Sequence, residues 1–148
     1  MKVLFAVDGS EYSRAAGEFL SAIPFIGDTE LTILNVIRSN FFDIPDRFAI
    51  EIDERAKESV ERARAIEFNQ SGNIIDQAQG YLGRTFRKVQ VVSIIGDPSD
   101  QILRTAEEMN ADIITVGCRG LRGIKGMLGS VSRNVLTHSE SSVLIGKA

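Results

Sequence analysis

The sequence has very few of the residues that build disulfides, metal centres and catalytic triads. Cys118 is its only cysteine and His138 its only histidine among 148 residues. A single thiol cannot form an internal disulfide, which suits a reducing compartment. Without a second histidine or a cysteine pair, a metal site built from protein ligands is not expected. No histidine can be assigned as a base for Ser10, Ser130 or Ser132, so the sequence predicts no catalytic residues.

Long apolar runs and a strong charge of either sign are also absent. No stretch approaches the roughly 20 apolar residues of a membrane span, and the run that follows Lys2 holds five apolar residues, fewer than a secretion signal needs. The formal net charge of −3 gives no general attraction to nucleic acid or to anionic membranes. We therefore expect a cytoplasmic protein with neither partner, folded as a single domain over residues 1–148.

What the chain does contain is a regular alternation of apolar strands and amphipathic helices. Strands are predicted at Lys2–Val7, Leu31–Ile37, Val89–Ile95, Ile113–Val116 and Val143–Ile145. Helical patterns fill the intervals, and the last of them covers Val131–His138. Such alternation predicts a parallel sheet with right-handed crossovers and helices on both faces.

Local signals place the ends of these helices. Ser10 or Ser13 is expected to cap the first helix, and Asp97 followed by Pro98 starts the third. In the long helical pattern between them, Ser71-Gly72-Asn73 is expected to act as a break.

Three segments should meet at one edge of this sheet, because the carboxyl ends of parallel strands lie together. They are Asp8-Gly9-Ser10, Val36-Ile37 and Gly117–Ser130. Folds of this kind bind ligands at that edge, where the strand order reverses. Two roles are open for Asp8, which could contact a nucleoside or a cation or could cap the helix that follows.

The third of these segments is rich in glycine and in positive charge. Glycine recurs at every third position from Gly117 to Gly129, with Arg119, Arg122 and Lys125 between. Uncovered backbone N–H groups and the helix dipole at such a junction favour a phosphate, so we expect a nucleotide site. The alternative is a flexible connection whose Ser130 caps the last helix. Neither the Walker A pattern nor the Gly-x-Gly-x-x-Gly turn is present.

These segments resemble the universal stress protein family over nearly the whole chain. The matching pieces are the opening strand into Asp8-Gly9-Ser10, Leu34-Asn35-Val36, Gly96-Asp97-Pro98, Ala111–Gly117, Gly129-Ser130-Val131-Ser132 and Ser142–Ile145. The resemblance implies a doubly wound α/β fold, of the adenine nucleotide alpha hydrolase-like type, whose parallel sheet has the order 3-2-1-4-5. It also implies ATP binding, homodimers and a role in stress tolerance.

The same resemblance implies which residues would hold ATP, with AMP or another adenine nucleotide as alternatives. The nucleoside would contact Ala6, Val7, Asp8 and Val36; ribose and phosphate would contact Val116, Gly117, Arg119 and Gly120; and the polyphosphate would contact Gly129, Ser130, Val131 and Ser132. Mg²⁺ or Mn²⁺ would be held largely by phosphate and water. In one respect the chain departs from the family, because eight residues separate Gly120 from Gly129, one fewer than in members that bind ATP.

The last predicted strand suggests a dimer. Val143, Leu144 and Ile145 would lie on an exposed sheet edge in a monomer, and pairing this edge with its symmetry mate gives a closed dimer of the kind common in the family. The alternative is an edge protected by its shortness and by Lys147. Three functions are then open: an ATP-binding regulator or adaptor, a dimeric scaffold that has lost nucleotide binding, and a slow ATP hydrolase.

Overall fold

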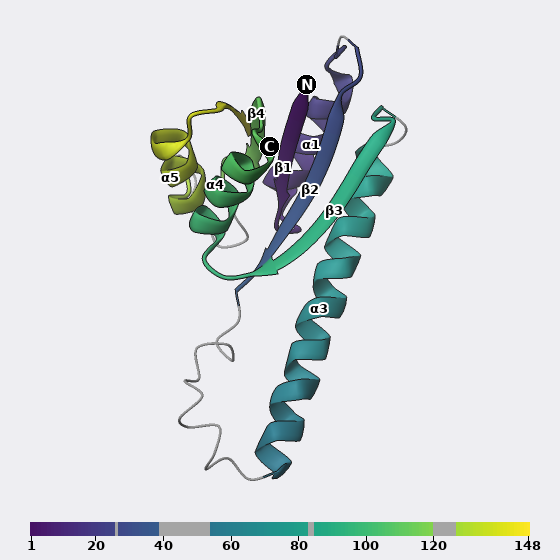
Figure 1. Ribbon diagram of the computed structural model, residues 1–148, viewed down its shortest axis with the longest axis vertical. Helices are drawn as coiled ribbons and strands as arrows, with labels where there is room; N and C mark the ends of the chain where they lie inside the picture. The colour runs from purple at the N-terminus through teal and green to yellow at the C-terminus, as the bar shows by residue number, and fades with distance from the viewer. Residues whose placement is uncertain (26, 39–53, 83–84, 120–126) are drawn as a thin grey trace.

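A parallel sheet of five strands carries the fold (Figure 1). The computed structural model describes residues 1–25, 27–38, 54–82, 85–119 and 127–148. The strands are β1 (Lys2–Val7), β2 (Glu30–Ile37), β3 (Lys88–Ile95), β4 (Ile113–Gly117) and β5 (Ser142–Gly146), in the order β3-β2-β1-β4-β5. The helices are α1 (Glu11–Ala22), α3 (Glu54–Leu82), α4 (Pro98–Met109) and α5 (Ser130–His138). The predicted doubly wound order is confirmed.

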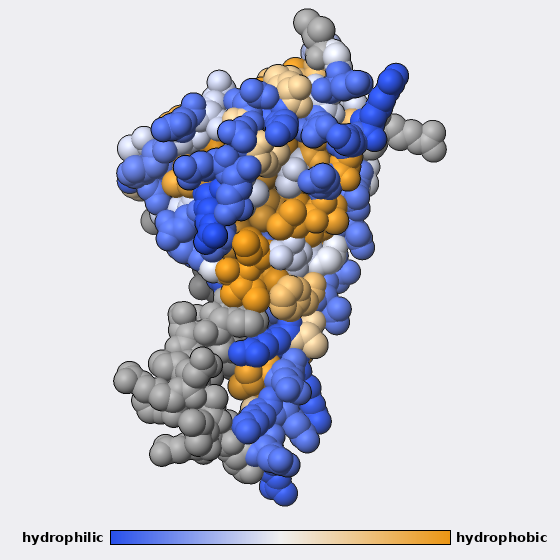
Figure 2. Space-filling view, in the orientation of Figure 1, coloured by the Kyte–Doolittle hydropathy of each residue, from blue (hydrophilic) through white to orange (hydrophobic). Residues whose placement is uncertain are grey.

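Helices lie on both faces of the sheet. Successive β1 side chains point to opposite faces, so Phe5 packs with Leu20 of α1 and Ile75 of α3, while Leu4 packs with Ile102 of α4. Burial on both faces explains why β1 is a continuous apolar run. On the α4 face, hydrophobic surface remains visible along the strands beside α4 (Figure 2).

The starts of α1 and α4 are capped as the sequence predicts. The Ser10 hydroxyl accepts a hydrogen bond of 3.1 Å from the N–H of Ser13. The Asp97 carboxylate accepts hydrogen bonds from the N–H groups of Ser99 at 2.9 Å and Asp100 at 3.2 Å. Each side chain satisfies N–H groups that have no partner within the helix.

The long helix α3 is continuous over 29 residues, so the break predicted at Ser71-Gly72-Asn73 is wrong. Ser71 is buried, and its hydroxyl forms a 2.7 Å hydrogen bond with the Ser93 hydroxyl of β3. Gly72 faces open space, so its lack of a side chain leaves no cavity. Packing against the sheet outweighs the weak helix propensity of this segment. Despite the length of α3, no described helix combines length and apolar character enough to cross a membrane.

Two glycines let α1 lie directly on β4 and β5. A Cβ atom on Gly117 would be 2.6 Å from the Ser13 nitrogen, and one on Gly146 would be 2.3 Å from the Ala16 Cα atom. Such distances exclude any side chain unless the helix moves. Gly117 therefore has a packing role in addition to its position at the predicted site.

Candidate functional site

The strand order reverses between β1 and β4. β1 pairs with β2 on one side and with β4 on the other. The chain leaves β1 toward α1 on one face of the sheet and leaves β4 toward α5 on the opposite face (Figure 1). Asp8 follows β1 and Gly117 ends β4, so both predicted site residues lie at this reversal, where doubly wound folds bind ligands.

Asp8 shapes the turn from β1 into α1. Its Oδ1 atom accepts hydrogen bonds from the N–H of Ser10 at 3.0 Å and from the Ser10 hydroxyl at 2.6 Å. Gly9 between them has a φ of +77°, a conformation that glycine adopts without strain. The Ser10 hydroxyl also lies 3.4 Å from the Arg119 carbonyl oxygen. Asp8 thus orients the residue that caps α1 and is not itself the cap.

At the end of β2, Asn35 ties β2 to β1. Its Nδ2 group donates a 2.7 Å hydrogen bond to the Val7 carbonyl, and its side chain is buried. In the sequence, Asn35 stands out only as part of the family motif Leu34-Asn35-Val36, although a polar residue inside an apolar strand is itself a signal of such a role. The neighbouring Val36 is half-buried with Ala6 on the α4 and α5 face, whereas Val7 and Val116 are buried.

The N-terminus of α5 has no side-chain cap. Gly129 is the N-cap, with φ −62° and ψ 159°, so the alternative in which Ser130 caps this helix is wrong. Ser130 is the first helical residue and is exposed. The first hydrogen bond of the helix runs from the N–H of Arg133 to the Gly129 carbonyl at 3.0 Å. The N–H groups of Ser130, Val131 and Ser132 therefore have no hydrogen-bond partner within the helix. The helix dipole favours an anion at this position.

A carbonyl at the end of β4 anchors this helix start. The Cys118 carbonyl accepts hydrogen bonds from the Gly129 N–H at 2.7 Å and from the Ser132 hydroxyl at 2.9 Å. The Ser132 hydroxyl also lies 3.1 Å from the Gly129 carbonyl, and the side chain is only 2% exposed. Ser132 consequently offers its backbone N–H to the open end of α5, because its hydroxyl is used inside the protein.

Arg119 lies just beyond the end of β4, with its guanidinium group against Tyr12 of α1. The centre of its guanidinium group lies 4.5 Å from the centroid of the Tyr12 ring, a cation–π contact. A Cβ atom built on Gly129 would be 3.2 Å from the Arg119 Cα atom, so the Arg119 backbone adjoins the α5 N-cap. Gly120, which the resemblance also assigns to the site, lies outside the described residues, as do Arg122 and Lys125.

Metal ligands are not gathered at this edge. Within the described ranges, no three histidine, cysteine or acidic side chains come close enough to hold a metal ion. His138 lies at the other end of α5, where its Nδ1 atom is 2.9 Å from the Asn134 carbonyl oxygen.

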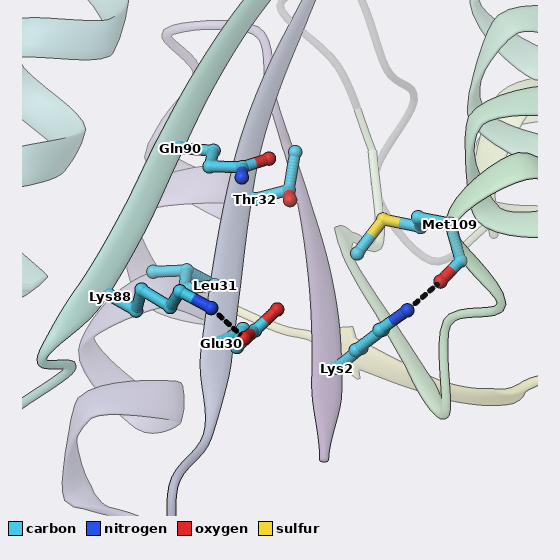
Figure 3. Close-up of a pocket in the computed structure, with 7 residues that line it drawn as sticks. All are labelled: Lys2, Glu30, Leu31, Thr32, Lys88, Gln90 and Met109. Atoms are coloured by element: carbon cyan, nitrogen blue, oxygen red, sulfur yellow. Dashed lines mark hydrogen bonds and ion pairs between the residues drawn. The ribbon is translucent and has the colours of Figure 1, made fainter.

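A hollow of about 170 Å³ lies at the opposite, amino end of the strands (Figure 3). Its charged groups have partners within the protein. Lys2 Nζ donates a 2.9 Å hydrogen bond to the Met109 carbonyl, and Lys88 pairs with Glu30, which holds the pKa of the Glu30 carboxyl below its usual value. This hollow is remote from Asp8 and α5, so it is not part of the candidate site.

Comparison with known proteins identifies the family. The model of the universal stress protein family matches residues 1–147. The chain belongs to this family. It is 29% identical over 154 residues to the universal stress protein YxiE of Bacillus subtilis, with 97% of each chain covered. It is 26% identical over 152 residues to the universal stress protein MJ0577 of Methanocaldococcus jannaschii, covering 99% of this chain and 94% of that one. The solved structure of MJ0577 matches with a TM-score of 0.79 at 25% identity, covering 99% of this family member and 95% of that chain.

Three more distant structures of the same fold contain adenine nucleotides. A universal stress protein in complex with cAMP is 24% identical, with a TM-score of 0.63 and coverage of 98% and 94%. The protein from Archaeoglobus fulgidus in complex with dAMP is 15% identical, with a TM-score of 0.68 and coverage of 99% and 98%. A family protein from Arabidopsis thaliana with AMP bound is 19% identical, with a TM-score of 0.61 and coverage of 100% and 93%. At these identities the likeness establishes the shared fold.

Proposed function

We propose that this universal stress protein binds an adenine nucleotide at the carboxyl edge of its sheet and acts in the cytoplasm as a nucleotide-dependent regulator or adaptor of the stress response. The observation that carries the proposal is the open start of α5. Three N–H groups there have neither an intrahelical partner nor a side-chain cap, and the Arg119 backbone adjoins the Gly129 N-cap. Such a helix start is a ready site for phosphate.

The surroundings of α5 suit the rest of a nucleotide. Ala6 and Val36 offer half-buried apolar surface on the face that carries α5, and Asp8 supplies a carboxylate at the end of β1. We propose ATP as the ligand, with Mg²⁺ or Mn²⁺ held by its phosphates and by water. The cAMP, dAMP and AMP bound by three proteins of this fold support an adenine nucleotide.

Regulation by binding is a better match to this site than rapid turnover. His138 lies at the C-terminal end of α5, about 9–12 Å along the helix from the open N–H groups. A histidine base is therefore not within reach of a phosphate bound there. We infer that any ATP hydrolysis is slow, and that bound nucleotide acts by changing which surfaces the protein presents.

We also propose a homodimer through β5. The N–H of Ser142 donates a hydrogen bond to the carbonyl of Asp112, the residue before β4, and the Gly146 carbonyl accepts one from the N–H of Cys118, the residue after β4. The backbone N–H and C=O groups of the even-numbered residues of β5 therefore point toward β4. The backbone groups of Val143 and Ile145 therefore point to the outer edge. An Ile145→Pro substitution removes an outward N–H without removing a bond to β4, whereas Leu144→Pro would disrupt the sheet itself. We expect Ile145→Pro to lower the sedimenting mass, and an unchanged mass would argue for another interface.

The nucleotide proposal is tested by examining what the protein carries. Freshly purified protein is denatured, the released small molecules are identified by mass spectrometry, and stripped protein is titrated calorimetrically with Mg-ATP, AMP and cAMP. We expect an adenine nucleotide to be released or to bind. Absence of any bound nucleotide together with silent titrations would favour the dimeric scaffold, for which the shortened Gly120–Gly129 spacing is the specific argument.

A further inference from the structure

The other edge strand, β3, is long, exposed and unprotected. It runs for eight residues and pairs, in the part of the chain that the structure describes, with β2 alone. Val89 is 39% exposed and Val91 is 51% exposed. From Val89 to Ile95 there is no charged residue, no proline and no glycine. Edge strands usually contain such residues, because an unprotected edge pairs with another strand.

The backbone of β3 presents a regular set of groups to the outside. The N–H of Gly96 donates a 3.1 Å hydrogen bond to the Ile37 carbonyl of β2. In a parallel ladder, both backbone groups of one residue point to the same side and the side alternates along the strand. The N–H and C=O groups of Val89, Val91 and Ser93 therefore point away from β2.

We propose that two copies of this chain pair through β3, antiparallel, about a two-fold axis that passes beside Val91. In this register Val91 lies opposite Val91 of the partner subunit, and Val89 lies opposite Ser93 of the partner subunit. The outward N–H and C=O groups of one β3 strand then face the outward C=O and N–H groups of the other, as a hydrogen-bonded antiparallel pair requires. Val89 also lies diagonal to Val91 of the partner subunit, so the four exposed valines form one apolar row.

The backbone pattern indicates a second copy as the partner, because the outward groups of β3 are complementary to those of the same strand turned about Val91. From Val89 to Ile95 the edge carries no charge, so no like charges meet within the apolar row. The two copies of Lys88 are offset by six residues, roughly 20 Å along the strands, so they do not repel at close range.

This contact is independent of the proposed β5 dimer and of nucleotide binding. β3 and β5 lie at opposite margins of the sheet. A single pair of strands is small beside the roughly 1,600 Å² of a standard interface, so we expect association that strengthens with protein concentration. Combined with the β5 dimer, it would join dimers into larger assemblies.

Cysteine cross-linking tests the register directly. Val91→Cys and Val89→Cys are made in a Cys118→Ser background, and each protein is treated with a mild oxidant at high concentration. Opposite residues of a hydrogen-bonded pair have Cα atoms about 5.5 Å apart, within the range of a disulfide. The two Val89 positions are offset by four residues, roughly 13 Å along the strands, so they cannot be bridged. We expect disulfide-linked dimers to form at least ten times faster with Val91→Cys.

Two results would overturn the proposal. Equal rates for the two cysteine variants would indicate unspecific collision, and no cross-linking of Val91→Cys would show that these edges do not meet.

A second measurement uses Val91→Pro, which removes an outward N–H but no hydrogen bond to β2, with Val91→Thr as the matched control. Sedimentation velocity is measured over a range of protein concentrations. The wild type, Val91→Thr and Ile145→Pro should all show the association step that depends on β3, and Val91→Pro should lose it. A folded Val91→Pro protein that keeps this step would also contradict the proposal.

Discussion

α4 and α5 lie on the same face of the sheet and begin near the same edge, yet their first turns are completed differently. The start of α4 is closed by Asp97, which accepts hydrogen bonds from two N–H groups. The start of α5 has Gly129 at the equivalent position and no side-chain hydrogen bond. Glycine in place of a capping side chain costs only about 0.3 kcal/mol of stability. It also leaves N–H groups available, so an anionic ligand can occupy the position that a side chain takes in α4.

α1 extends the comparison to the opposite face. Its first turn is closed by Ser10, which Asp8 holds in place, and it is packed against Gly117. Two helix starts at this edge are thus capped by side chains, whereas the start of α5 has no side-chain cap. The following four experiments test that division, beginning with the largest expected effect.

The closed start of α1 should not tolerate a side chain at Gly117. We expect Gly117→Ala to lower the free energy of unfolding by about 3 kcal/mol, because the added Cβ would lie 2.6 Å from the Ser13 nitrogen. Urea unfolding followed by circular dichroism measures the change. Gly72→Ala is the matched control, since its Cβ meets open space, and it should stabilise the protein by about 0.5–1 kcal/mol. Equal stability of the two variants would mean that α1 does not pack on β4 as closely as described.

A carboxylate at Gly129 should convert the open start of α5 into a copy of the α4 start. We expect Gly129→Asp to bind nucleotide at least tenfold more weakly than Gly129→Ala, a difference of about 1.4 kcal/mol. The carboxylate would accept hydrogen bonds from the open N–H groups of α5 and would repel a phosphate. Calorimetric titration measures the affinities. Both variants add the same Cβ, 3.2 Å from the Arg119 Cα atom, so equal affinities would place the phosphates elsewhere.

The buried hydroxyl of Ser132 should matter for stability and its exposed neighbour should not. Ser132→Ala removes the donor to the Cys118 and Gly129 carbonyls, and we expect a loss of about 1.5 kcal/mol in the free energy of unfolding. Ser130→Ala is the control, and because Ser130 is exposed and is not the cap, it should change stability by less than about 0.5 kcal/mol. A larger effect of Ser130→Ala would assign the cap to Ser130 after all.

Removing the cap of α4 should lower stability without affecting the ligand. We expect Asp97→Ala to cost about 1 kcal/mol in urea unfolding. Nucleotide affinity should remain within twofold of the wild type, because the start of α4 already has a protein partner for its N–H groups. A marked loss of affinity in a protein that is still folded would mean that Asp97, rather than the open start of α5 alone, serves the ligand.

Much of the fold was accessible from local patterns, whereas parts of the site were not. The caps at Ser10 and Asp97 were recognised because a side chain and the N–H groups it accepts are neighbours in the sequence. The alternative of a Ser130 cap is wrong because the position of a cap depends on where the chain turns, here one residue earlier. The role of Gly117 in packing against α1 escaped prediction because Tyr12 and Ser13 are distant along the chain.

The distinction follows from the range of the interactions. Hydrophobic periodicity, strand length and helix caps act over a few residues, and they were enough to predict the alternation of strands and helices and the sheet edge that carries the candidate site. The continuity of α3 through Ser71, the anchoring of α5 by the Cys118 carbonyl and the outward groups of β3 depend on segments that meet only after folding. Since hydrogen bonds and close contacts act over a few ångströms in space and not along the chain, only the tertiary structure could decide them.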